Sequence, residues 1–131
     1  MVDTNGLILK VKVTAANVGD REGAKQTLLP LKDKLPRMKK LWMDGGYDGE
    51  SFAQWVLDEL GWVVEITHRP KGSKGFQVVP RRWVVERTFA WICKYRRLSK
   101  DYEYLTETSE SFIYAAMIHL MLRRLARKAP T

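Results

Sequence analysis

Asp44 and Glu86 are the two carboxylates whose surroundings suit metal-dependent phosphate chemistry. Asp44 ends a short apolar run, and the glycines that follow it, Gly45-Gly46, let backbone, a metal ion or a substrate come close. Hard Mg²⁺ takes one or two carboxylates and completes its coordination with water and phosphate oxygens. Two such ions can hold the attacking and leaving oxygens of a phosphoryl displacement. An ordinary strand-to-loop turn at Asp44 is the alternative.

Glu86 lies in a segment, residues 80–92, that has the spacing of a helix with several arginines. At about 100° per residue, the positions within about 40° of Glu86 are Arg82, Ala90, Cys93 and Arg97. Ala90 and Cys93 are small and leave room beside the carboxylate, while arginines can hold phosphates. A merely solvated Arg-Glu-Arg face is the alternative. The neighbouring apolar stripe, expected to pack on a core, is Val85, Phe89 and Ile92.

The composition favours a polyanionic partner. The 131 residues are 45% hydrophobic and carry a net charge of +8, with five Trp and five Tyr. A basic, aromatic-rich chain of this size is typical of a globular domain that binds nucleic acid. The single Cys excludes an internal disulfide framework and a Cys-based zinc site. No stretch has the length of a membrane span and no signal-peptide pattern is present, so we expect a cytoplasmic protein with no membrane partner.

The elements that must position these residues alternate between β and α. We expect strands over residues 7–13, 39–44 and 62–66, and helices over residues 21–34, 52–60, 80–92 and 107–128. Asp20 is the expected N-cap of the first helix, Pro30 is expected to bend or end it, and Gly61 is expected to close the second. This order predicts an α/β architecture with a partly parallel sheet and flanking helices.

The N-terminal strand needs a hairpin partner. Asn5-Gly6 is the strongest short hairpin signal in the chain, and the segment 7–13 alternates between apolar and polar residues. Because only four residues precede Asn5, we expect the chain to begin inside a structural unit.

Two other segments carry charges with open interpretations. Residues 67–75 form a basic, glycine-bearing loop that is either a solvated linker or a contact for phosphates. The last helix, 107–128, places acidic residues in its first turn and basic residues in its last, as the helix dipole prefers. Its broad apolar face is expected to pack on the core, with a dimer surface as the alternative.

Two motifs resemble the C-terminal part of the catalytic domain of bacterial insertion-sequence transposases of the DDE class. They are Asp44-Gly45-Gly46-Tyr47-Asp48-Gly49 and Arg81-Arg82-Trp83-Val84-Val85-Glu86-Arg87-Thr88-Phe89-Ala90-Trp91. Three further segments resemble that family in the same order: Val2-Asp3-Thr4-Asn5-Gly6-Leu7, Val13-Thr14-Ala15-Ala16-Asn17 and Lys100-Asp101-Tyr102-Glu103. The resemblance covers essentially the whole chain.

The resemblance implies an N-terminally truncated, ribonuclease-H-like mixed sheet with flanking helices. It divides the chain into a sheet-and-helix part (1–66), a basic loop (67–80) and the Glu86 helix with the C-terminal helix (81–131). Asp44 would be the second carboxylate and Glu86 the third, holding two Mg²⁺ or Mn²⁺ ions that cut and join DNA. The DNA would be the terminal inverted repeats and a target, and the protein would be associated with the nucleoid.

The family surrounds its Glu with a Tyr, Arg, Glu, Lys signature. Arg82 matches the Arg, Val79 stands at the Tyr position and Cys93 at the Lys position. Either Lys94 or Arg97 can fill the role of that Lys. The expected DNA contacts are Arg82, Arg87, Lys94, Arg96, Arg97, Arg69, Lys71 and Lys74.

The first Asp of the family has no counterpart on the expected strand, and Asp3 stands beside the turn instead. We therefore expect the chain to be inactive alone, as a frameshift-expressed half that is fused to an upstream product or as a truncated copy. It would act as a homodimer or within that fusion. The alternative function is a non-catalytic DNA-binding remnant or inhibitor, and a basic RNA-binding module is a weaker one.

Overall fold

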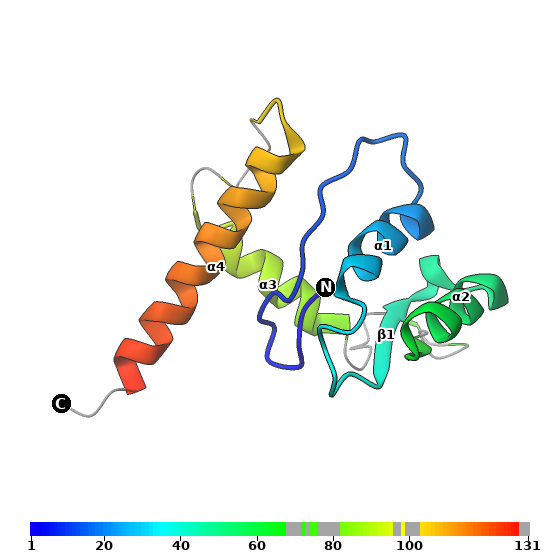
Figure 1. Cartoon of the computed structure of the whole chain (residues 1–131). Helices are drawn as coiled ribbons and strands as arrows, with labels where there is room; N and C mark the ends of the chain where they lie inside the picture. Colours follow the sequence, from blue (N-terminus) through cyan, green and yellow to red (C-terminus); the bar gives the residue numbers. More distant parts are fainter. Residues whose placement is uncertain (68–71, 73, 76–81, 96–97, 99–102, 129–131) are drawn as a thin grey trace.

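A computed structural model of the chain describes residues 1–67, 72, 74–75, 82–95, 98 and 103–128. Within them the fold is mixed α/β, with four α-helices and a parallel pair of strands. The elements, in order, are α1 (Asp20–Leu28), η1 (Leu29–Leu31), β1 (Lys40–Asp44), η2 (Gly45–Tyr47), α2 (Glu50–Leu60), β2 (Val63–Thr67), α3 (Arg82–Ile92) and α4 (Thr106–Lys128). Figure 1 shows α1 and α2 with the sheet on one side and α3 with α4 on the other.

The sheet is a β-α-β unit. β1 and β2 pair in parallel, with Lys40 opposite Val63 and Asp44 opposite Thr67, and α2 connects them. Gly61 closes α2 in the left-handed conformation at φ 72°, as its position in the sequence predicts. Because the strands are parallel, their carboxyl ends meet at one edge, and Asp44 lies at that edge.

The main core lies between the sheet and the helices α1 and α2. Its buried residues are Leu28, Leu31, Leu41, Phe52, Val56 and Trp62. α1 is shorter than the predicted 21–34: it ends at Leu28 and passes into a 3-10 turn that contains Pro30. Asp20 is the first helical residue, and the N-cap is Gly19, with no side-chain cap.

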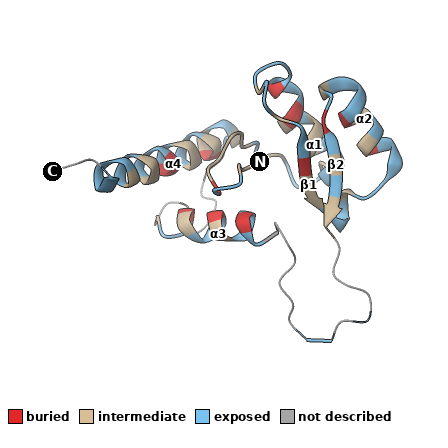
Figure 2. Ribbon diagram, turned by 90° about the horizontal axis from the view of Figure 1, so that it is seen from below, coloured by how far each residue is buried: buried red, intermediate tan, exposed pale blue. Residues whose placement is uncertain are grey.

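α3 packs through a different face from the predicted one. Val84, Thr88 and Ile92 are buried, whereas Val85 is 42% exposed and Phe89 is 58% exposed. The predicted stripe was therefore wrong except at Ile92. Figure 2 shows the buried residues of α3 on the side turned toward α4 and the N-terminal segment. The reason is that the Thr88 hydroxyl reaches a backbone carbonyl of that segment, so a polar residue lies at the centre of the buried face.

The predicted hairpin turn is present near Asn5-Gly6. Gly6 N–H donates to the carbonyl of Asp3 (3.0 Å), Asp3 N–H donates to the carbonyl of Leu7 (2.9 Å), and Val2 and Ile8 form an antiparallel bridge. Gly6 has a left-handed backbone at φ 82°. Residues 4–6 therefore form a three-residue hairpin loop that ends in a β-bulge at Gly6. Asp3 Oδ1 accepts from the amides of Asn5 and Leu7, which uses this carboxylate in the turn.

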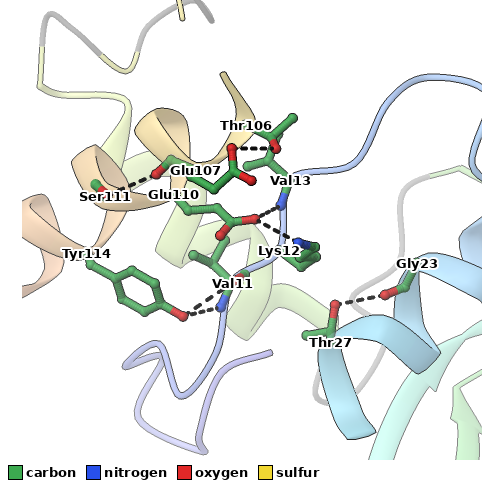
Figure 3. A network of polar contacts seen from close by, with 10 residues as sticks. All are labelled: Val11, Lys12, Val13, Gly23, Thr27, Thr106, Glu107, Glu110, Ser111 and Tyr114. Carbon is green, nitrogen blue, oxygen red and sulfur yellow. Dashed lines mark hydrogen bonds and ion pairs between the residues drawn. The ribbon is translucent and has the colours of Figure 1, made fainter. Parts of the chain in front are cut away.

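A strand was predicted over residues 7–13. Within the described residues, this segment forms a β-bridge only at Ile8. Farther on, the chain is attached to α4 by side chains. Val11 N–H donates to the Tyr114 hydroxyl (2.9 Å), and Val13 N–H donates to Glu110 Oε1 (2.8 Å). Figure 3 shows these bonds and the Lys12–Glu110 ion pair. Alternate amides of an extended segment point to one side, so two acceptors one helical turn apart bind both.

Candidate active site

Asp44 lies at the carboxyl edge of β1. Its backbone is extended (φ −80°, ψ 175°), its side chain is exposed, and its Oδ1 accepts from the amide of Gly46 at 3.0 Å. The bond starts the 3-10 turn η2 and fixes the carboxylate close to the strand end. In open α/β sheets ligands bind outside the carboxyl ends of the strands, so this position suits a ligand-binding carboxylate.

A second carboxylate, that of Asp20, lies beside the same turn. A Cβ atom added at Gly46 would lie 3.1 Å from Asp44 Oδ1 and 4.0 Å from Asp20 Oδ2. Burial, followed by the charges of Asp20 and Asp44, raises the pKa of the Tyr47 phenol above its ordinary value of 10.0. Sequence reasoning missed this proximity because it read Asp20 only as a helix cap. Its position in the first turn of α1 carries no signal of a partner that lies 24 residues farther along the chain.

The neighbouring Arg21 ties α1 to the loop that follows Asp44. Its guanidinium donates to the carbonyl of Asp48 and lies over Gly49, where an added Cβ would be 3.2 Å from one guanidinium nitrogen. Gly49 has φ 143°, so a larger residue would be strained there as well as crowded. Arg21 therefore helps to hold the start of α1, and with it Asp20, beside the Asp44 turn.

Glu86 is exposed on α3, and Ala90 and Cys93 are exposed on the same face, as the helical spacing predicts. α3 packs against β1, which places Glu86 and Asp44 on neighbouring elements. Over the part of the chain that the structure describes, however, no three His, Cys, Asp or Glu side chains gather closely enough to hold a metal ion. The structure therefore brings the elements of the predicted pair, β1 and α3, together.

Arg87, one of the expected DNA contacts, is turned toward the protein. It donates to the carbonyl of Asn5 at 2.9 Å and lies over the rings of Trp83 and Trp91, 4.5 and 4.7 Å from their centroids. Its Nε is buried without a hydrogen-bond partner among the described residues. In this structure its contacts hold α3 against the hairpin.

The remaining expected DNA contacts fall into two groups. Lys74 and Lys94 are exposed. The side chain of Arg82 and the residues Arg69, Lys71, Arg96 and Arg97, together with Val79, lie outside the described structure.

Known proteins resemble the chain over most of its length. The family model "Transposase DDE domain" matches residues 1–121. A protein of Burkholderia cepacia named "Putative transposase for insertion sequence element IS402" is 30% identical over 124 residues, which cover 86% of this chain and 56% of that relative. The chain thus spans a little over half the length of the curated relative. No solved structure matches it. No helix in the described residues has the length and hydropathy of a membrane span.

Proposed function

The chain belongs to the DDE class of bacterial insertion-sequence transposases, and on that premise we propose that it supplies two carboxylates of a DNA-cleaving site, Asp44 and Glu86. The observation that carries the proposal is the exposed position of Asp44 at the carboxyl edge of a parallel strand, next to the helix that bears Glu86. The reaction would be strand cleavage at the inverted repeats of an insertion sequence, followed by transfer to a target.

The chain would be part of a ribonuclease-H-like catalytic domain. The parallel pair β1–β2 with its connecting helix supports this proposal, since it supplies a strand end for one carboxylate and a following helix for another. The relative is longer than this chain, so further strands would come from the rest of the whole protein. In this division residues 1–66 would supply the helices α1 and α2 and nearly all of the sheet, and residues 81–131 would carry Glu86 and α4.

The carboxylates fit a hard divalent cation in their chemistry. Oxygen ligands suit Mg²⁺ and Mn²⁺, and Asp44 uses one oxygen for the Gly46 amide, which leaves the other free of that bond. A bound ion would stabilise charge on the phosphate and lower the pKa of a bound water. Asp44 and Glu86 would hold the ions, and nearby Asp20 would add negative charge that favours a cation. A third carboxylate would come from elsewhere in the whole protein, because Asp3 is engaged in its own turn.

A second candidate is a DNA-binding protein that does not cut. It is favoured by the absence of a three-ligand group among the described residues and by the net charge of +8. Such a protein would occupy the ends of an element or mix with intact transposase. It predicts DNA binding that needs neither a divalent cation nor Asp44.

Excision of a marked element in cells separates the two functions. The whole transposase that contains this chain would be expressed with Asp44→Asn or Glu86→Gln, which remove charge with little change of shape. Loss of an outer-shell partner alone costs about 10–100-fold, so we expect excision to fall by at least about a hundredfold.

The matched controls are Asp33→Asn and Glu59→Gln, which change exposed residues in the turn after η1 and in α2. Asp33 has φ 63°, a conformation that Asn tolerates. Excision with the controls should stay near that of the unchanged protein. Normal excision by Glu86→Gln would show that Glu86 is not a catalytic residue.

A further inference from the structure

We propose that a hollow between α3 and α4 binds the phosphate backbone of duplex DNA, as a second contact apart from Asp44 and Glu86. The inference rests on the proposed function, because it takes DNA as the ligand. It adds the C-terminal end of α4 to the DNA-binding surface, which the motif around Glu86 does not include.

The hollow has a volume of about 400 Å³ and is lined by cations from both sides. Lys94 comes from the turn after α3, and Arg123, Arg124 and Arg127 come from α4. No acidic residue lines it, and no ion pair joins these four cations to any carboxylate of the described chain. Like charges held together without counter-charges favour an anion in the space between them.

The helix dipole does not account for these charges. It favours cations in the last turn of a helix, which explains Arg127 and Lys128. Its effect falls off within that turn, whereas Arg123 and Arg124 lie farther from the end and Lys94 is not on α4 at all. The cluster therefore exceeds what α4 needs for its own stability.

Arg124 is held in place by an aromatic ring. Its guanidinium lies 4.3 Å from the centroid of Trp91, and Arg87 lies 4.7 Å from the same centroid. Stacking uses the flat face of a guanidinium and leaves its N–H edge to donate to phosphate oxygens. Because the side chain is already ordered, less conformational entropy is lost when DNA binds. Trp91 itself is occupied by arginines, so the hollow suits backbone phosphates better than stacked bases.

A contact between Tyr95 and His119 braces the hollow. The Tyr95 hydroxyl and His119 Nδ1 are 2.5 Å apart, and their rings meet edge-on at 82° with centroids separated by 5.6 Å. Tyr95 follows α3 and His119 lies on α4, so the contact fixes the two cationic walls relative to each other. The hollow is thus held by contacts between aromatic side chains and not by the lysine and arginines alone.

The spacing suits a duplex that also reaches Glu86. Lys94 follows Glu86 by eight residues, or roughly 12 Å along the direction of α3. One strand of B-DNA rises about 3.4 Å per nucleotide. The hollow would therefore contact phosphates roughly three to four base pairs from the phosphodiester bond that is cleaved at Glu86.

The test compares two double variants of the full chain. Lys94→Gln with Arg127→Gln removes one Lys and one Arg from opposite walls of the hollow. Lys34→Gln with Arg37→Gln removes the same two charges from exposed positions after η1. Fluorescence anisotropy would follow binding of each protein to a labelled duplex DNA of arbitrary sequence at several salt concentrations, with duplex RNA as a competitor.

We expect the unchanged chain to bind with a steep salt dependence. Each lost phosphate contact lowers the magnitude of the slope of log K against log [salt] by about 0.9. The slope should therefore be smaller by about two for the hollow variant, and it should change clearly less for the control variant. Equal losses in both variants would overturn the hollow while leaving DNA binding intact. No binding by the unchanged chain would also overturn the hollow, whereas the proposed cleavage is tested separately by excision with Asp44→Asn and Glu86→Gln in the whole protein. Stronger competition by RNA than by DNA would overturn the choice of DNA.

Discussion

The hydroxyl of Thr88 donates a buried 2.6 Å hydrogen bond to the carbonyl oxygen of Gly6, a residue 82 positions earlier in the chain. Arg87 repeats the connection one residue away, through its 2.9 Å bond to the carbonyl of Asn5. Both bonds join the helix that carries Glu86 to the N-terminal hairpin. The position of the proposed catalytic Glu86 therefore depends on a turn that itself carries no catalytic group.

Replacing Thr88 by Val should destabilise the chain. Val keeps the shape of the side chain but removes its hydroxyl, so the buried carbonyl of Gly6 loses its donor. An unsatisfied buried group costs about 1–3 kcal/mol, and denaturant unfolding would measure that loss. Thr88→Ser keeps the hydroxyl and should lose less stability. Equal losses in both variants would show that the hydrogen bond does not hold the helix.

Replacing Gly6 by Ala should cost more stability than replacing Gly61 by Ala. Both glycines are left-handed, at φ 82° and φ 72°, a conformation that costs a residue with a Cβ about 1–2 kcal/mol. At Gly61 the added Cβ meets open space, whereas at Gly6 it lies 2.9 Å from Thr88 Oγ1 and 3.1 Å from the Trp91 ring. Both variants carry the cost of the left-handed backbone, so the difference between their melting temperatures measures the cost of the close contacts at Gly6. Equal melting temperatures would contradict the close approach.

The stability of the chain should fall at high pH partly through Tyr47. Its pKa is raised in the folded state by burial and by Asp20 and Asp44. Below pH 10.0, its ordinary pKa, the contribution of this group is complete. As pH rises from there through the raised pKa, the unfolded chain binds fewer protons than the folded one, and stability is lost.

Two variants test the effect of Tyr47 on stability and the cause of its raised pKa. Tyr47→Phe cannot titrate, so its free energy of unfolding should fall less than that of the unchanged chain above about pH 10. Asp20→Asn should lower the pKa of Tyr47, measured from its ring resonances by NMR, whereas Asp33→Asn should leave it unchanged. An unchanged Tyr47 pKa in Asp20→Asn would mean that Asp20 is not beside Tyr47 in solution.

Amide exchange tests the attachment of the N-terminal segment to α4. Glu110→Ala removes the acceptor of the Val13 amide but leaves the Tyr114 hydroxyl that binds Val11. A net hydrogen bond of about 0.5–1.5 kcal/mol corresponds to roughly two- to tenfold faster exchange, which we expect at Val13 and not at Val11. Glu107→Ala, one turn earlier, is the control. Unchanged exchange at Val13 would show that the segment is held in another way.

The local elements of this fold could be predicted from sequence because their signals are local. Gly61 closes α2, Pro30 lies in the 3-10 turn after α1, and Asn5-Gly6 forms the hairpin loop. Asp44 at a strand end was predictable for the same reason, since an apolar run stops there and glycines follow.

The contacts between distant elements could not be predicted in this way. The choice of the buried face of α3 depends on Thr88, whose polarity marks it as exposed until its acceptor at Gly6 is known. The proximity of Asp20 to Asp44 and the meeting of Lys94 with α4 also depend on tertiary packing. The spacing of residues within one helix or strand does not predict such contacts.

We assign Glu86 to DNA cleavage and not to DNA binding. The most direct measurement follows both in one sample: the whole transposase containing this chain, with a labelled duplex that carries an end of its element, in Mg²⁺. We predict that Glu86→Gln binds the duplex as tightly as the unchanged protein and leaves it uncut, while Glu59→Gln binds and cuts. Cleavage by Glu86→Gln at the rate of the unchanged protein would contradict the assignment.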